Sequence, residues 1–457
     1  MAPSIRVRCL PAFCFLILLA WAVAVRADEE PGTTAIPPGL ANYVSRPEPK
    51  FRWELRDKKT VAGTTVYTLH VTSQEWQSIV WEHDLQVFQP GDVAPAATML
   101  LWNQGGKAGD RSVGLGLDLA QRVKAPVALL GGIPNQPLLG GKTEDTLIAE
   151  TYIRYLETRD ETWPLLFPMV KSLVKAMDAL QEFSKNEWKH RLSGFVVSGG
   201  SKRGWTTWLT AAADPRVKAI VPMVIDTLNM RDQMTWQLKS FGKYSDQIHD
   251  YTARGLVPMP DTPEARKLWA MVDPWVYRDK LTLPKLLING NNDQYWTSDA
   301  LNLYWNDLKG DKWVLYVPNA GHGLEQQFAD GQRPNRDRAL NALAAFTRHI
   351  IKDNPVPKLT WKHDDADGKA RLTVEARPQP LAARLWVARA PTRDFRLAQF
   401  HEQPLPVDSE KGVGGTIVGE VPLPTEGNLS FFAELDYEID GLKHQLSTQL
   451  RIVEPAK

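Results

Sequence analysis

The chain has 457 residues, 43% of them hydrophobic and 23% charged, which is the composition of a folded globular protein and not of a disordered one. Its formal net charge of +1 and the lack of long runs of one charge sign give no reason to expect a nucleic acid or an anionic membrane as a partner. The length suits two domains, or one large domain with an appendage.

Residues 1–27 have the pattern of a secretory signal peptide. Arg6 and Arg8 form a basic start, an apolar run follows, and Val25 and Ala27 provide a small-x-small cleavage pattern. The apolar run is shorter than the roughly 20 residues of a membrane span, although an uncleaved anchor stays the alternative. We therefore expect an exported protein, periplasmic or extracellular, with no membrane segment after cleavage.

The only cysteines, Cys9 and Cys14, lie within this leader. A mature chain without cysteine has no disulfide bonds, no thiol catalysis and no cysteine-ligated zinc. Another cluster of metal-binding residue types, Glu82-His83-Asp84, lies in a strand-like run, where His83 would face away from its two neighbours. We expect no metal and no cofactor.

The rest of the chain divides by pattern into three parts. Residues 28–50 are rich in Pro, Gly and Thr and predict a poorly ordered lead-in. Over residues 51–353, three alternating runs typical of edge antiparallel strands are followed by apolar strand runs that alternate with helical patterns. This alternation predicts an α/β domain with a mostly parallel sheet, covered by helices on both faces.

Two segments depart from this alternation. Residues 227–281 are polar and rich in Met, Trp and Tyr, which suits a helical cap over a site or an ordinary helical insertion. After the linker DNPVPK, residues 358–457 contain short alternating runs separated by turn residues. They predict a small C-terminal β-sandwich domain.

The stretch GFVVSGGSKRGW, residues 194–205, places Ser201 between a strand and a helix. Such a tight turn exposes the serine hydroxyl and points the first N–H groups of the helix at a developing oxyanion. The usual pattern is G-x-S-x-G, but Arg203 occupies the second glycine position and Gly204 follows it. Ser201 is therefore a candidate nucleophile, and the alternative is a plain helix-capping serine.

Two more residues complete a candidate triad in the chain order of α/β hydrolases, which is serine, acid, histidine. Asp293 follows the strand run PKLLING, and His322 follows KWVLYVPNAG. The carboxyl ends of strands are where catalytic groups collect in open α/β sheets. The sequence thus predicts an α/β-hydrolase fold with Ser201, Asp293 and His322 as triad, and Asp226, at the end of another strand run, is the alternative acid.

The neighbours of these residues supply candidates for binding. The backbone N–H of Lys202 is the expected first oxyanion donor, and the second is expected after the run ATMLLWNQGG, at Asn103 or Gln104. The basic pair at 202–203 suits an anionic substrate such as a carboxylated sugar ester, unless Arg203 is spent on an internal ion pair. The substrate-binding candidates are Arg203, Asp226, Trp205 and Trp296.

The block SGGSKRGWTTWLTAAADPRVKAIVPMVID, with WEHDLQVFQP before it and NGNNDQYW and PNAGHGLE after it, resembles the PhoPQ-activated pathogenicity-related protein family. The resemblance spans most of residues 40–350. It implies an α/β-hydrolase-like fold with a triad at Ser201, Asp293 and His322, and it implies that Arg203 belongs to the family's own pattern. The substrate class of the family is poorly defined, so the resemblance supports the fold and site more than the reaction.

We expect hydrolysis of an ester by acyl transfer on a small-molecule or peptide substrate. A serine peptidase of the prolyl-peptidase type is the second interpretation. A third, from a different class, is a catalytically silent secreted binding or signalling protein built on a hydrolase scaffold. The sequence leaves the oligomeric state open.

Overall fold

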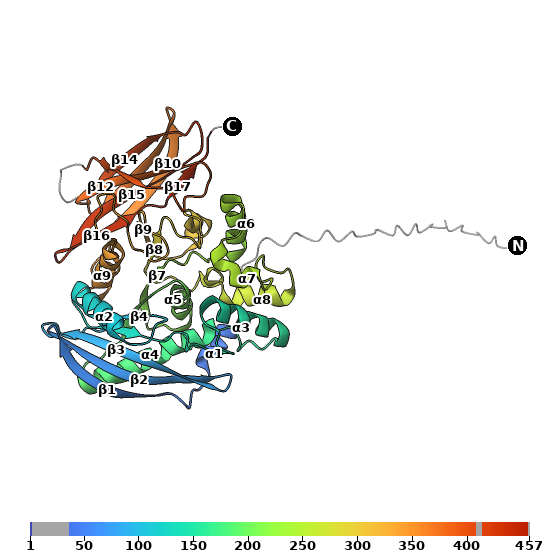
Figure 1. The fold of residues 1–457 in the computed structure, drawn as a ribbon, viewed down its shortest axis with the longest axis vertical. Coiled ribbons are helices and arrows are strands. Elements are labelled where there is room, and N and C mark those ends of the chain that lie inside the picture. The colour runs from blue at the N-terminus through green and yellow to red at the C-terminus, as the bar shows by residue number, and fades with distance from the viewer. Residues whose placement is uncertain (2–35, 408–413, 456–457) are drawn as a thin grey trace. The chain divides into compact units, whose positions relative to one another are not determined.

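The structure is a computed structural model that describes Met1 and residues 36–407 and 414–455 (Figure 1). Apart from Met1, the expected signal peptide lies outside the described residues, as does the lead-in through residue 35. Within the described part of the chain, no helix is both long and apolar enough to cross a bilayer.

A large mixed sheet forms the centre of the fold, in the order β1-β2-β3-β5-β4-β6-β7-β8-β9. Its first three strands are antiparallel, as the alternating runs predicted: β1 (Arg52–Val61), β2 (Thr64–Trp76) and β3 (Ile79–Pro90). The next six run parallel to one another: β4 (Thr98–Asn103), β5 (Val127–Leu130), β6 (Gly194–Gly200), β7 (Val217–Met223), β8 (Lys285–Gly290) and β9 (Lys312–Val317).

Helices cover both faces of this sheet, and each face has its own apolar core. Because side chains alternate along a strand, Leu100 and Leu101 of β4 point into the two different cores. One core contains residues of α2 (Asp110–Val123) and α9 (Asp337–Ile351), and the other contains residues of α3 (Glu144–Thr158), α4 (Leu166–Glu187) and α5 (Lys202–Ala213). This is the sheet-and-helix architecture of an α/β hydrolase, as the sequence predicted.

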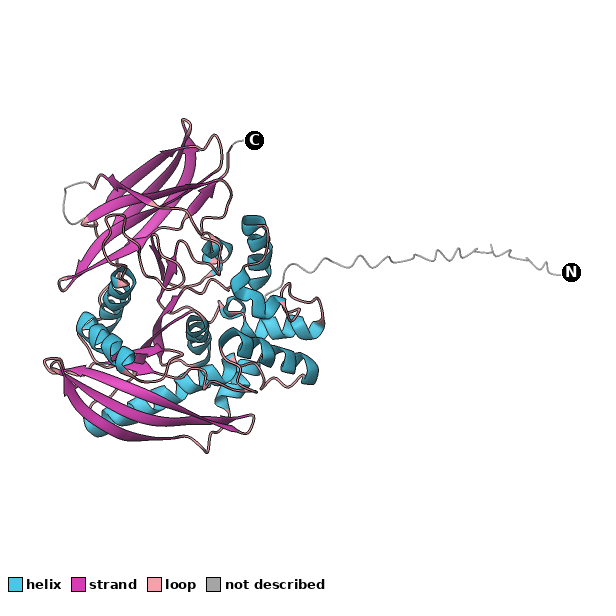
Figure 2. Cartoon of the chain, viewed as in Figure 1, coloured by secondary structure: helices cyan, strands magenta, loops and turns pink. Residues whose placement is uncertain are grey.

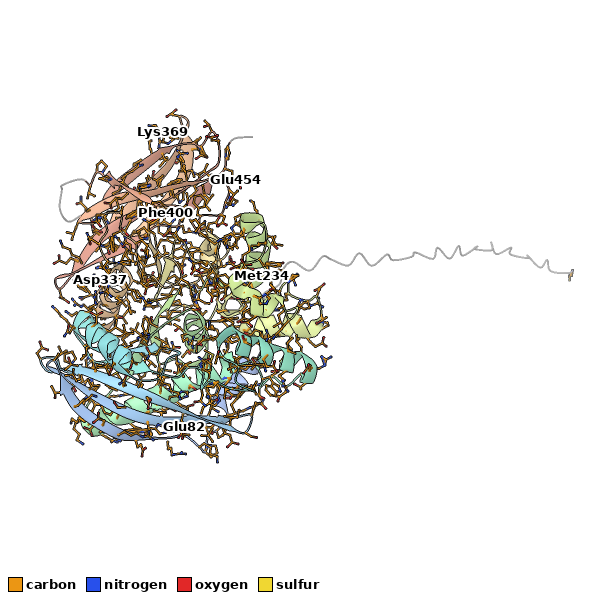
Figure 3. All side chains as sticks on the ribbon, in the orientation of Figure 1. Glu82, Met234, Asp337, Lys369, Phe400 and Glu454 are labelled. Atoms are coloured by element: carbon orange, nitrogen blue, oxygen red, sulfur yellow. The ribbon has the colours of Figure 1, made fainter. Side chains whose placement is uncertain are left out.

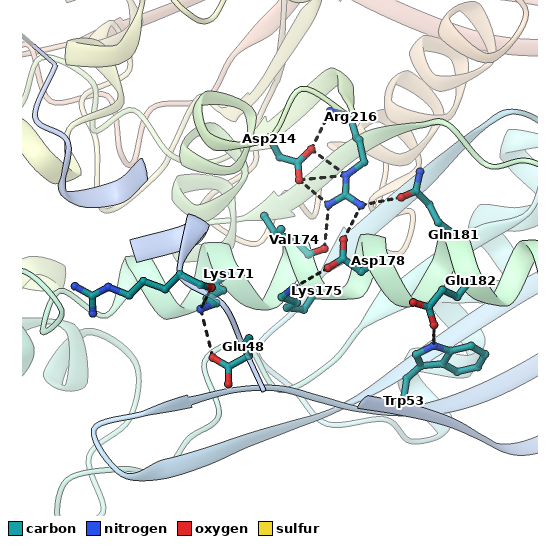
Figure 4. Close-up of polar contacts among 11 residues, drawn as sticks. Glu48, Trp53, Lys171, Val174, Lys175, Asp178, Gln181, Glu182, Asp214 and Arg216 are labelled. Carbon is teal, nitrogen blue, oxygen red and sulfur yellow. Dashed lines mark hydrogen bonds and ion pairs between the residues drawn. The ribbon is translucent and has the colours of Figure 1, made fainter. Parts of the chain in front are cut away.

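Polar contacts hold α4 to the chain that follows α5 (Figure 4). The Arg216 guanidinium donates to Asp178 at 2.7 Å and to Gln181 at 2.8 Å, both on α4, and also pairs with Asp214 at 2.7 Å. The C-terminal end of α5 is thereby tied to α4. At the other end of α4, Lys171 pairs with Glu48 at 3.3 Å.

The lead-in differs from the expectation of poor order. Residues Gly39–Ser45 form α1, which packs on α4 with Leu40 and Tyr43 buried. The Tyr43 hydroxyl donates to Gln74 at 2.8 Å. Two apolar side chains one turn apart anchor this short helix, and the Pro and Gly content of the segment concealed them.

The segment between β7 and β8 consists of short helices (Figure 2). These are α6 (Met230–Phe241), η1 (Asp246–Ile248), α7 (His249–Thr252), α8 (Pro263–Val272) and η2 (Pro274–Tyr277). They lie beside α3 and α5, and Trp205 of α5 donates its ring N–H to the Val272 carbonyl of α8 at 2.6 Å. Helix α5 is therefore fastened directly to this helical segment.

The C-terminal strands form two facing sheets. One contains β10 (Lys358–Ala366), β11 (Lys369–Arg377) and β14 (Gly415–Pro422). The other contains β12 (Ala382–Ala390), β13 (His401–Leu405), β15 (Asn428–Ile439), β16 (Leu442–Ser447) and β17 (Arg451–Val453), and it joins the central sheet where Ser447 pairs with Val314 of β9. Gly419 leaves room for Leu385 between the two, since a Cβ there would lie 2.9 Å from a Leu385 methyl.

Candidate active site

Ser201 lies on a strained turn between β6 and α5. Its φ of 56° and ψ of −127° put a non-glycine residue in a region that costs about 1–3 kcal/mol and that concentrates at functional sites. The Ser201 N–H donates to the Met223 carbonyl of the neighbouring strand at 2.9 Å. The hydroxyl is consequently presented at the carboxyl edge of the sheet, next to the N-terminus of α5.

Two glycines make this turn sterically feasible. A Cβ on Gly199 would lie 2.5 Å from the Asn103 amide nitrogen and 2.8 Å from the Arg203 Cβ. A Cβ on Gly204 would lie 3.0 Å from the carbonyl oxygens of both Gly199 and Met223. The close approach thus falls at position 204, which explains why the second glycine of the motif stands one residue later than usual.

Arg203 forms an internal ion pair, which is the alternative that the sequence left open. Its two terminal nitrogens donate to the two oxygens of Glu144, each at 2.7 Å, and Nε donates to the Ile133 carbonyl at 2.6 Å. Burial disfavours the Glu144 carboxylate, but Arg203 outweighs this and lowers the pKa of Glu144 to about 2. Arg203 therefore secures α3 to the elbow and presents no free charge to a ligand.

Lys202 is neutralised in the same way. Its ammonium lies 2.8 Å from Asp145 and 3.2 Å from Glu144. Burial opposes the charged form, but the Asp145 carboxylate outweighs it, and the Lys202 pKa is raised. The Tyr251 hydroxyl donates to the other oxygen of Asp145 at 3.0 Å, so the ion pair also contacts the helical segment.

Asp293 and His322, two of the three candidate triad residues, form a pair. Asp293 Oδ2 lies 2.8 Å from His322 Nδ1, and Oδ1 accepts the Tyr295 backbone N–H at 2.8 Å. Because a carboxylate only accepts hydrogen bonds, Nδ1 carries the proton and Nε2 keeps its lone pair. The arrangement prepares His322 to act as a base through Nε2.

The loops that carry this pair are held against each other and against the C-terminal strands. A Cβ on Gly290 would lie 2.5 Å from the carbonyl oxygens of Ala320 and Gly321, so only glycine permits the two loops to approach this closely. The Asn292 amide donates to the carbonyls of two residues between β12 and β13, Phe395 at 2.8 Å and Ala398 at 2.9 Å. A second amide, Asn319 on the His322 loop, donates to Phe400.

No hydrogen bond joins Ser201 to His322 among the described residues, although both lie near Tyr295. His322 Nε2 is shielded from solvent and has no hydrogen-bond partner within the described parts of the chain. The Tyr295 ring lies over the His322 ring, with centroids 4.1 Å apart, and also lines a cavity together with Ser201. Catalytic hydrogen bonds are often long in ligand-free enzymes and tighten only when substrate binds.

Asp226 does not contact His322. It is buried at the end of the turn after β7, where it accepts hydrogen bonds from the Tyr304 hydroxyl and, at 2.8 Å, from the Asn289 amide. Burial raises its pKa to about 7, and the Asp293 charge adds to the effect. Asp293, not Asp226, is therefore paired with the histidine, and Asp226 is not among the residues that line the cavity beside Ser201.

The two candidates for the second oxyanion donor are engaged elsewhere. The Asn103 amide donates to the Ser198 carbonyl at 2.8 Å, beneath the elbow, and the Gln104 N–H donates to the Leu130 carbonyl at 3.0 Å. Both residues therefore fix the loop after β4. The N–H of Lys202, in the first turn of α5, has no carbonyl one turn before it to bond, and it remains the donor that the elbow offers.

A cavity opens beside Ser201. Trp205 and Trp296, both candidates for substrate contact, line it, whereas Arg203 and Asp226 do not. The remaining lining comes mostly from the helical segment between β7 and β8: Met230, Met234, Ile248, Tyr251, Leu256, Val257, Met259 and Trp269, with Asp145, Lys202, Ile225, Thr227 and Tyr295 completing the wall.

No group of three or more His, Cys, Asp or Glu side chains is arranged to hold a metal ion in the described ranges. His83 is buried and contacts the Ser73 and Ser172 hydroxyls and the Gly132 carbonyl, on the face opposite to its acidic neighbours. The alternation expected for a strand at 82–84 is thus observed.

Comparison with known proteins shows the family of this chain. Residues 40–396 match the description "PhoPQ-activated pathogenicity-related protein". The chain belongs to the PhoPQ-activated pathogenicity-related protein family. Within it, the chain is 33% identical over 387 residues to autocrine proliferation repressor protein A of Dictyostelium discoideum, an alignment that covers 78% of this chain and 76% of that protein.

Among solved structures, the PhoPQ-related chain is similar to two acetyl xylan esterases. Esterase 1 from Thermoanaerobacterium sp. is 18% identical, with a TM-score of 0.48, and 69% of this chain covers 94% of that one. The enzyme from Paenibacillus sp. R4 is 13% identical, with a TM-score of 0.45, and the coverage is 69% and 91%. The hydrolase-type scaffold itself is established here by the strand order, the elbow and the paired loops.

Three contributors to this PhoPQ-related site escaped the sequence analysis. Glu144 and Asp145 stand in the first turn of a helix, where acidic residues are common for reasons of helix stability alone. Their pairing with the 202–203 cations is visible only in the fold. Tyr295 had a usable signal, because it follows the candidate acid Asp293 by two residues and its N–H could be expected to reach back to it.

Proposed function

We propose that the protein is a serine hydrolase of carboxylic esters that acts through Ser201, His322 and Asp293. The observation that carries the proposal is the 2.8 Å Asp293–His322 pair at the edge of the sheet where the strained Ser201 turn presents its hydroxyl. A serine held only as a helix cap needs neither a strained φ nor a histidine fixed in one tautomer.

The reaction follows from these positions. Ser201 Oγ bonds to the ester carbonyl carbon while its proton passes to His322 Nε2, and Asp293 stabilises the resulting imidazolium. The Lys202 N–H and the N-terminal end of α5 stabilise the oxyanion. When the bond to the leaving oxygen breaks, His322 returns its proton to that oxygen, and the acyl group stays on Ser201.

Water then completes the cycle. His322 takes a proton from the water molecule that attacks the acyl-enzyme, and the tetrahedral intermediate collapses to release the carboxylic acid. The proton on His322 goes back to Ser201 Oγ. The same two residues therefore serve both halves of the reaction, with no net change in the enzyme.

A fluorophosphonate probe tests the proposal on the purified chain. We expect labelling of the wild type, none of Ser201→Ala, and hydrolysis of p-nitrophenyl esters faster than of aminoacyl p-nitroanilides. Labelling that persists in Ser201→Ala, or no labelling of the folded wild type, would contradict the hydrolase. Faster cleavage of the anilides would favour a peptidase instead.

We also propose that the protein acts outside the cytoplasm after removal of residues 1–27, on the strength of the basic and apolar pattern of that leader. When the full chain is expressed, the protein recovered from the periplasm or medium should begin at Asp28, as measured by intact mass. Recovery of an uncleaved chain from the cytoplasm would contradict export.

A further inference from the structure

The cavity beside Ser201 has an apolar wall. Aliphatic and thioether side chains make up much of it: Met230, Met234, Ile248, Leu256, Val257 and Met259. These come from the helical segment between β7 and β8, and four of the six are less than a tenth exposed. Pockets with such walls favour apolar ligand groups, because filling them removes apolar surface from water on both sides.

The charged groups and some of the polar groups that reach this wall have partners within the protein, whereas Thr227 Oγ1, Trp269 Nε1 and Trp296 Nε1 have none among the described residues. Lys202 and the Tyr251 hydroxyl are both bonded to Asp145, at 2.8 Å and 3.0 Å. The Trp205 ring N–H donates to the Val272 carbonyl. A carboxylate on the substrate would have to break the Lys202–Asp145 pair and would leave the partly buried Asp145 without its cation, which is costly.

The position of His322 decides which part of the ester enters the cavity. Tyr295 lines the cavity and lies over the imidazole, whereas His322 is not among the described residues that line it. The leaving oxygen must lie beside His322 to receive its proton. The leaving group is therefore outside the cavity, and the acyl group is on the cavity side of Ser201.

We propose that the acyl group of the substrate is uncharged and apolar and that it fills this cavity, an inference that rests on the proposed ester hydrolysis. The helical segment between β7 and β8 is thus the acyl-binding wall. Each methylene of the acyl chain that leaves water for this cavity should raise kcat/KM by about fourfold.

Two ester comparisons test the inference on the wild type. p-Nitrophenyl octanoate should exceed p-nitrophenyl butyrate in kcat/KM by at least tenfold. p-Nitrophenyl hexanoate should exceed the mono-p-nitrophenyl ester of adipic acid by at least tenfold, since the two acyl chains match in length and differ in the terminal carboxylate. Equal rates, or a preference for the adipate ester, would overturn the inference.

A matched pair of variants locates the effect. Met234 lines the cavity from α6 (Figure 3), whereas Leu238, one turn later on the same helix, does not line it and is 43% exposed. Met234→Trp should lower the octanoate-to-butyrate ratio at least fivefold, and Leu238→Trp should leave it unchanged. An unchanged ratio in a folded Met234→Trp protein would overturn the assignment of the wall, and the wild-type ester comparisons decide the matter if that variant does not fold.

The fluorophosphonate reaction separates this inference from the function beneath it. A wild type that labels at Ser201 and hydrolyses esters without regard to chain length or charge keeps the proposed function and loses the acyl assignment. A wild type that does not label loses both.

Discussion

Two carboxylates follow neighbouring parallel strands of this sheet, and they have opposite surroundings. Asp293, after β8, accepts a backbone N–H and the imidazole of His322. Asp226, after β7, is sealed among Tyr304 and Asn289, and burial raises its pKa to about 7. A position at a strand end therefore does not by itself decide the role of a carboxylate; the groups that it contacts also do.

The largest loss of activity should come from removing the His322 imidazole, which pairs with Asp293 and not with Asp226. His322→Ala removes the base, and kcat/KM for a p-nitrophenyl ester should fall by about 10⁴-fold or more, as in other triads that act as a unit. Burst-phase kinetics measures the acylation step directly. A fall of less than tenfold would mean that another group takes the Ser201 proton.

Asp293→Asn should lower activity almost as much as His322→Ala. An amide can donate to Nδ1 and so stabilise the wrong tautomer, which leaves Nε2 protonated and unable to accept the Ser201 proton. We expect kcat to fall by about 10³- to 10⁴-fold with KM little changed. If Asp226→Asn lowered kcat as much while Asp293→Asn did not, the assignment of the two carboxylates would be reversed.

Asn292→Ala should lower activity by an intermediate amount, through its effect on Asp293 alone. Its amide holds the turn next to Asp293 to the carbonyls of Phe395 and Ala398, so its loss should loosen the acid and lower kcat by about tenfold. Asn292→Asp would lose the amide donor while keeping the side-chain size, and it should be no better. An effect on KM alone would show that the amide does not position the acid.

Part of this contrast was predictable from the sequence. The apolar runs PKLLING and KWVLYVPNAG predicted two strands, and they made Asp293 and His322, which follow these runs, candidates for the site. The Arg203–Glu144 pair was not predictable, because its partners are 59 residues apart and any of many acidic residues could have served. The same holds for Asn292, whose partners lie 103 and 106 residues away between β12 and β13, and for Asp226, whose burial depends on tertiary packing around Tyr304.

The smallest effect on activity, and the sharpest test of the comparison, should come from Asp226→Asn. Because Asp226 contacts neither the imidazole nor the cavity, kcat/KM at pH 7 should change by less than tenfold. Asn matches the carboxyl in size, and its single oxygen can still accept the hydrogen bond from Tyr304, although its NH2 group cannot accept the one from Asn289. A loss comparable to that of Asp293→Asn would show that the buried carboxyl takes part in catalysis.

Stability as a function of pH should reveal the difference that activity does not. The pKa of Asp226 is about 7 in the folded chain and near 3.8 when unfolded, so the folded state holds the extra proton between these values. The free energy of unfolding therefore falls as pH rises through this window, by up to about 4 kcal/mol from this group. Asp226→Asn removes that contribution. In urea titrations at pH 5 and pH 8, the variant should gain stability relative to the wild type as pH rises. An unchanged difference in stability would mean that Asp226 is ionised at both pH values. The two carboxylates would then be more alike than their surroundings indicate.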